Sequence, residues 1–164
     1  MFNQIKIKNM KKLIAVVLVS ILSLLNGVAA HKDHREQRQT KALVKDTMPL
    51  IIIASISSLV DLMPDLVREV AKENNIDLNE IKKNCKRLMG EIENLKRTGI
   101  NKKVDINEFD FLSVGLQKIN DMCVKKGCDL NGLNANKEYV KCLLTSYNSS
   151  LVHKAERIIR SLKK

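Results

Sequence analysis

The sequence predicts an all-α protein, a small bundle of four to five helices cross-linked by two disulfides after a cleaved signal peptide. Three observations support this prediction. Apolar residues recur at spacings of three and four in the C-terminal half of the chain, which is the period of one helix face. Helix-capping patterns precede two of these segments. All four cysteines follow residue 30, and exported chains oxidise such even sets to disulfides.

Residues 1–30 have the features of a secretory signal. Positively charged residues precede an apolar run, Leu13 to Leu25, which is interrupted only by two serines. Val28-Ala29-Ala30 supplies the small residues of a cleavage site. The apolar run of about 13 residues is shorter than the roughly 20 that span a bilayer. We therefore expect cleavage after Ala30, a secreted, extracellular protein, and no transmembrane anchor in the mature chain.

The composition of the mature chain limits the classes of partner. Without the four lysines of the leader, 25 basic residues face 18 acidic ones. This excess favours an acidic or anionic partner, although charge of this size also serves solubility alone. The mature chain has two Phe, two Tyr and no Trp. Because single-stranded nucleic acid is held by stacking on aromatic side chains, the composition argues against nucleic acid as the partner.

The mature chain is predicted to comprise a polar N-terminal arm or weak helix over residues 31–47 and a helical domain over residues 48–164. Pro49 precedes the apolar run Leu50–Val60, in which only serines are polar. Its triplet Ile51-Ile52-Ile53 is also compatible with a buried strand. A proline at the first helical position, and the lack of a partner strand, favour a buried helix. A second segment follows Pro64 and extends to Glu73.

Two further helices are predicted from capping patterns. Asp77 and Glu80 precede one apolar stripe, and Asp105 and Glu108 precede another, which Gly127 ends. The first stripe contains Ile81, Cys85, Leu88, Ile92 and Leu95, and the second contains Phe109, Leu112, Leu116, Ile119 and Cys123. The last helix is predicted over about residues 135–162, with one apolar face: Val140, Leu144, Tyr147, Leu151, Ala155, Ile158 and Leu162.

The stripes suggest how the cysteines pair. If the two capped helices form an antiparallel hairpin around residue 104, Cys85 lies level with Cys123, and Cys128 is left for Cys142. This pairing is preferred. The alternative is Cys85 with Cys128 and Cys123 with Cys142. The sequence has no Cys-x-x-Cys pair and no histidine near these cysteines, so a zinc site is not expected, and no other metal or cofactor is predicted.

No sequence pattern predicts catalysis. A Gly-rich phosphate loop, His-Glu-x-x-His and Gly-x-Ser-x-Gly are all absent from the sequence. Two other features remain. Asn148-Ser149-Ser150 is a glycosylation sequon, and the last helix carries a candidate basic patch, which complements the helix dipole or contacts an acidic partner: Lys154, Arg157, Arg160, Lys163 and Lys164.

The expected function is therefore non-enzymatic. We expect a secreted effector-like, salivary, venom-like or cytokine-like protein that binds a macromolecule, in the first place an extracellular protein, outside the producing cell. One alternative is an extracellular carrier of small apolar ligands, which predicts an enclosed internal cavity. Another is a cationic membrane-active protein, which the apolar segment from Leu50 to Met63 would support.

Overall fold

The computed structural model describes residues 34–97 and 108–163. Within these residues the chain forms six α-helices and no strand: α2 (His34–Leu62), α3 (Pro64–Glu73), α4 (Leu78–Arg97), α5 (Glu108–Lys125), α6 (Ala135–Ser146) and α7 (Ser149–Leu162). The all-α prediction is confirmed, with one helix more than the upper predicted number. The predicted signal peptide, the capping pattern at Asp105 and the terminal Lys164 lie outside the described residues.

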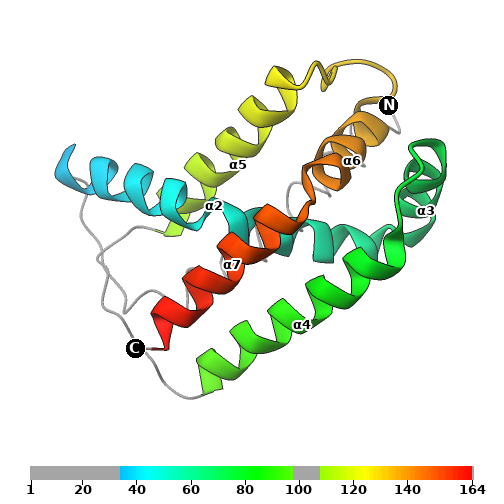
Figure 1. The fold of residues 1–164 in the computed structure, drawn as a ribbon. Helices are drawn as coiled ribbons and strands as arrows, with labels where there is room; N and C mark the ends of the chain where they lie inside the picture. The colour runs from blue at the N-terminus through cyan, green and yellow to red at the C-terminus, as the bar shows by residue number, and fades with distance from the viewer. Residues whose placement is uncertain (1–33, 98–107, 164) are drawn as a thin grey trace.

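Helix α2 is the centre of the molecule and contacts each of the other five helices. Figure 1 shows it crossing the bundle, with α5 above it and α4 below it. Six of its apolar side chains have no exposed surface: Val44, Leu50, Ile51, Ile53, Ala54 and Ile56. A helix that is apolar all round is stable in water only when neighbours cover it. By length and composition, residues 38–62 could also cross a membrane, but 61% of that apolar window is buried inside the protein.

The start of α2 differs from the prediction. The helix runs from His34 through Pro49, so the segment predicted as a polar arm or weak helix is helical over its described part, and Pro49 does not occupy a first helical position. The cause is tertiary packing, because Val44 is fully buried in the common core. Such packing routinely overrides local propensity. The cost is one backbone bond, since Pro49 has no N–H to donate to the carbonyl of Lys45.

Helix α4 follows the prediction closely. Its predicted stripe is buried throughout, with exposed fractions from 0% at Leu88 to 5% at Leu95. Asp77 precedes the helix, and its Oδ1 accepts a hydrogen bond from the amide of Asn79 at 2.8 Å. This bond satisfies one of the free N–H groups of the first turn.

The predicted end of α5 at Gly127 is confirmed. Gly127 has a φ of +82°, a left-handed conformation that glycine adopts without a Cβ penalty. Its N–H donates to the carbonyl of Val124 at 2.9 Å, and the N–H of Cys128 donates to the carbonyl of Cys123 at 3.0 Å. These two bonds form a Schellman motif, which turns the chain away from α5 toward α6.

The predicted hairpin of α4 and α5 is not formed. Helix α4 packs on α2 and α7, whereas α5 packs on α2 and α6. Both helices pack on α2, where the α4 stripe is buried and, of the α5 stripe, Ile119 and Cys123 are buried. Neither helix therefore needs the other to cover these apolar side chains. The register that placed Cys85 level with Cys123 therefore does not exist in this fold.

The cysteine pairing changes with the helix arrangement. Cys123 of α5 forms a disulfide with Cys142 of α6, with 5.5 Å between their Cα atoms. This bond belongs to the alternative connectivity, and neither bond of the preferred connectivity is present. Cys85 is a buried free thiol and Cys128 a partly exposed one. The structure thus has one disulfide among the described residues, where two were predicted.

The last predicted helix is two helices. Helix α6 ends at Ser146, and Tyr147 and Asn148 are both extended, with ψ values of 127° and 171°. The Tyr147 hydroxyl accepts a hydrogen bond from Nδ2 of Asn84 on α4 at 2.6 Å. Asn148 caps α7, because its Oδ1 accepts from the amide of Leu151 at 2.8 Å. The break changes the direction of the chain, so that α7 packs along both α2 and α4.

Candidate binding groove

A groove of about 670 Å³ lies between α2 and α7 and is open to solvent on one side. Its floor is apolar and consists of buried or half-buried side chains: Met48, Pro49 and Ile52 from α2, and Leu151 and Ile158 from α7. We call this feature the α2–α7 groove. Serines from α7 and from the end of α6 complete its lining.

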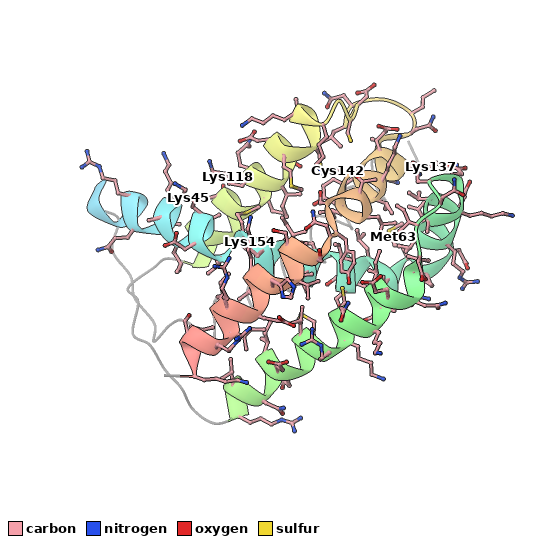
Figure 2. All side chains as sticks on the ribbon, viewed as in Figure 1. Lys45, Met63, Lys118, Lys137, Cys142 and Lys154 are labelled. Carbon is pink, nitrogen blue, oxygen red and sulfur yellow. A yellow bond between two sulfur atoms is a disulfide. The ribbon has the colours of Figure 1, made fainter. Side chains whose placement is uncertain are left out.

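Exposed cations form the rim of the groove. Lys45 lies on the α2 side, and Lys154 and Arg157 lie on the α7 side. Figure 2 labels Lys45 and Lys154 on these two helices. Asp46 is the acidic lining residue, so the rim carries a net charge of two positive units. None of the three cations forms an ion pair within 4 Å with a residue in the described part of the chain.

The other polar edge of α7 is neutralised by carboxylates of α7 itself and of α4. Arg160 approaches Glu156 of its own helix to 3.8 Å, and Lys163, the residue that follows α7, lies 3.5 Å from Glu91 of α4. Glu156 also accepts a hydrogen bond from Arg87 of α4 at 2.7 Å. Hydrogen bonding by Arg87 is the main cause that lowers the pKa of the Glu156 carboxyl below its ordinary value.

The structure thus divides the predicted basic patch. Arg160 pairs with Glu156 of its own helix, and Lys163 pairs with Glu91 of α4. Lys154 and Arg157 face the α2–α7 groove instead. No sequence pattern links Lys45 to this group, because it lies about a hundred residues earlier in the chain and only helix packing brings it to the same groove.

The sequon lies at one end of the groove. Asn148 and Ser150 both line it and are exposed. The cap hydrogen bond uses Oδ1 of Asn148, whereas a glycan is attached through Nδ2. A glycan at this position is therefore compatible with the cap.

A second surface cavity, of about 610 Å³, lies between α2 and α4. Asp61, Lys82 and Lys86 line it together with the thiol-bearing Cys85. Burial, with a smaller contribution from the charge of Asp61, raises the pKa of Cys85 to about 12. A thiol that stays protonated is a poor nucleophile, so burial disfavours Cys85 as a nucleophile in this cavity.

The described residues contain no group of three or more His, Cys, Asp or Glu side chains placed to hold a metal ion. The expected lack of a cofactor and of enzymatic activity stays a prediction.

The comparisons with known proteins give no further constraint. No protein-family model, no curated protein and no solved structure matches this chain. Any functional assignment therefore depends on the geometry and chemistry of the chain itself.

Proposed function

We propose that this chain is a secreted, non-enzymatic protein that binds a macromolecular partner outside the producing cell, and that the α2–α7 groove is the binding site. The observation that carries the proposal is the combination, in one surface groove, of an apolar floor with rim cations that have no ion pair among the described residues. Surface charges without an internal partner are free to pair across an interface, where complementary charge adds to association rate and specificity.

Export is part of the proposal. A disulfide is stable in oxidising compartments and is rare in the cytosol of most cells, so the bond between Cys123 and Cys142 supports an extracellular location. The lysine-rich and apolar leader at residues 1–30 supports the same location.

A carrier of small apolar ligands is the second candidate, because the volume of the groove falls within the range of small-molecule sites. The open side of the groove favours a macromolecule over a carried ligand. Carrier sites enclose most of their ligand, whereas both cavities described above open at the surface.

The membrane-active alternative depended on the apolar segment from Leu50 to Met63. Most of this segment forms the buried centre of the bundle, where a bilayer reaches it only after unfolding. The proposal therefore does not include membrane insertion.

Site-specific crosslinking tests the proposal. A photoreactive side chain replaces Ser150 in the groove of the mature chain, and a control carries it at Lys72, which is exposed on α3. We expect a reproducible protein adduct from extracellular extracts at position 150 and not at position 72. The same adducts at both positions, or co-purified lipid without any protein adduct, would contradict the proposal.

A further inference from the structure

We infer that the ligand of the α2–α7 groove is an amphipathic α-helix of a protein partner, with acidic residues along the edges of its apolar face. The inference rests on the proposed function and specifies the chemistry of the partner. Three properties of the groove support it: its open side, its length and the positions of its cations.

Because the groove is open on one side, the ligand surface that faces water must be polar. A ligand in this groove contacts the apolar floor on one side and water on the other. An acyl chain seated there would leave much of its apolar surface in water, which costs about 25 cal/mol for each Å² exposed. An amphipathic helix places apolar side chains inward and polar ones outward, which is the helix-in-groove mode of recognition.

The length of the groove fits a short helix. Its lining on α7 extends from Ser150 to Ser161, which is about 16 Å at 1.5 Å per residue. A ligand helix of three turns has the same length. Such a helix presents apolar side chains at positions i, i+3, i+4 and i+7, enough to contact the floor from Leu151 to Ile158.

The cations lie on both sides of the floor. Lys154 and Arg157 are three residues apart on α7 and therefore one turn apart, and Lys45 projects from α2 across the groove. Acidic residues one turn apart on one edge of a ligand helix match the α7 pair, and an acidic residue on the other edge matches Lys45. A sulfated polysaccharide would satisfy the cations but has no apolar face for the floor.

Three matched peptides of about 14 residues, kept helical by a side-chain lactam, test the inference because free helices of this length are marginal in water. The first has an apolar face of Leu and Ala edged by Glu. The second has Lys in place of every Glu, and the third has the composition of the first with its apolar positions shuffled. Binding of each fluorescent peptide to the mature protein is measured by anisotropy at about 50 mM and 300 mM salt.

Two double variants of α7 locate the contact. Lys154→Gln/Arg157→Gln removes the rim cations, and Arg160→Gln/Lys163→Gln removes the same charge from the edge that faces α4. We expect the first variant to weaken binding of the Glu-edged peptide by roughly 5- to 30-fold, the effect of two partly exposed ion pairs, and the second to change it less than about twofold. Thermal unfolding followed by circular dichroism verifies that both variants are folded.

Several results would overturn the inference. Equal binding of the Glu-edged and Lys-edged peptides would remove the role of charge, and equal binding of the shuffled peptide would remove the role of the apolar floor. An equal loss of affinity for the Glu-edged peptide in the two double variants would show that the peptide does not bind at the groove rim. Binding of a fluorescent fatty acid in the absence of peptide binding would assign the groove to a small ligand.

The crosslinking experiment separates this inference from the proposed function. If position 150 captures a protein but the Glu-edged peptide does not bind, the helical ligand is wrong and the proposed function stands. If position 150 captures no protein and the peptide also fails, both are wrong.

Discussion

Arg87 of α4 and Glu156 of α7 form an ion pair with 2.7 Å between Nη2 and Oε1. The pair joins two helices that are 69 residues apart in sequence. Glu156 also contacts His153 and Arg160 of its own helix, so one carboxylate organises the polar edge between α4 and α7.

Replacing Glu156 with Gln is expected to destabilise the protein by about 1 kcal/mol, because Arg87 is 42% exposed and solvent screens such pairs. The folded-state pKa of Glu156 lies below its ordinary value of 4.5. Its contribution is therefore fully present above pH 4.5 and is lost as the pH falls through the lower folded-state pKa.

Urea unfolding between about pH 3 and pH 7 measures the difference in unfolding free energy between the wild type and Glu156→Gln. This difference should shrink at the acidic end of the range. Glu93→Gln is a matched control, since Glu93 is exposed on α4 and should have little effect at any pH. A difference between wild type and Glu156→Gln that is constant over the range would contradict the assignment.

The disulfide between Cys123 and Cys142 closes a loop with a sequence separation of 19, for which chain entropy predicts a stabilisation of about 3 kcal/mol. Cys142→Ser should lose about this amount in urea unfolding. Cys128→Ser, the control, should lose less than about 1 kcal/mol, since Cys128 is a partly exposed free thiol. Peptide mapping without reduction should recover the linked peptides of Cys123 and Cys142. A linked peptide containing Cys85 and Cys123 would show that the helix arrangement is wrong.

The two free thiols should differ in reactivity. Cys85 is 2% exposed and burial raises its pKa to about 12, so at about pH 8 it is a protected, neutral thiol. Cys128 is partly exposed. Iodoacetamide should therefore modify Cys128 in the native protein and Cys85 only after denaturation, as read by mass spectrometry. Rapid native modification of Cys85 would mean that α4 does not pack on α2 as described.

Pro49→Ala is expected to stabilise the protein by roughly 1 to 2 kcal/mol. Alanine supplies the backbone N–H that can donate to the Lys45 carbonyl. An interior proline destabilises a helix by about 3 kcal/mol. Part of this loss is offset because proline also restricts the conformations of the unfolded chain. Pro64 provides the control, because it lies in the first turn of α3, where proline is favourable. Pro64→Ala should be neutral or destabilising. An equal response of the two variants would indicate that α2 begins at Pro49 after all.

Asn148 has two separable roles. Asn148→Ala removes the cap of α7 and should cost about 1 kcal/mol in unfolding free energy, whereas Asn148→Asp keeps the cap acceptor and should cost much less. Both remove the sequon, as does Ser150→Ala. In a glycosylating host, intact mass should show a glycan on the wild type only. If Asn148→Asp and Asn148→Ala are equally unstable, the side-chain cap is not the cause.

The sequence predicted best those helices for which the apolar stripe and the capping residues indicate the same bounds. For α4, Asp77 fixes the start and the stripe from Ile81 to Leu95 is buried. Gly127 likewise marked the end of α5. These signals are local, so they remain valid whatever the helix packs against.

The errors concern relations between helices. The local sequence around Pro49 predicts a helix start, but α2 begins at His34, and its N-terminal part is held in the core by the buried Val44. The pairing of Cys85 with Cys123 required α4 and α5 to be neighbours, which their stripes do not determine. The break before α7 had a local signal, since Asn148 is a good cap residue, but the apolar periodicity continued across it. The groove could not be predicted, because it depends on the approach of α2 to α7.

The central position of α2 has a consequence for biosynthesis. Its apolar surface is covered in part by α7, whose first residue, Ser149, is made 87 residues after Leu62. At 5 to 20 residues per second, the nascent chain carries an incompletely covered apolar helix for roughly 4 to 17 s. During that interval it is a substrate for chaperones and prone to aggregation. Truncation of the last 16 residues should therefore leave a chain that is made but cannot complete its core.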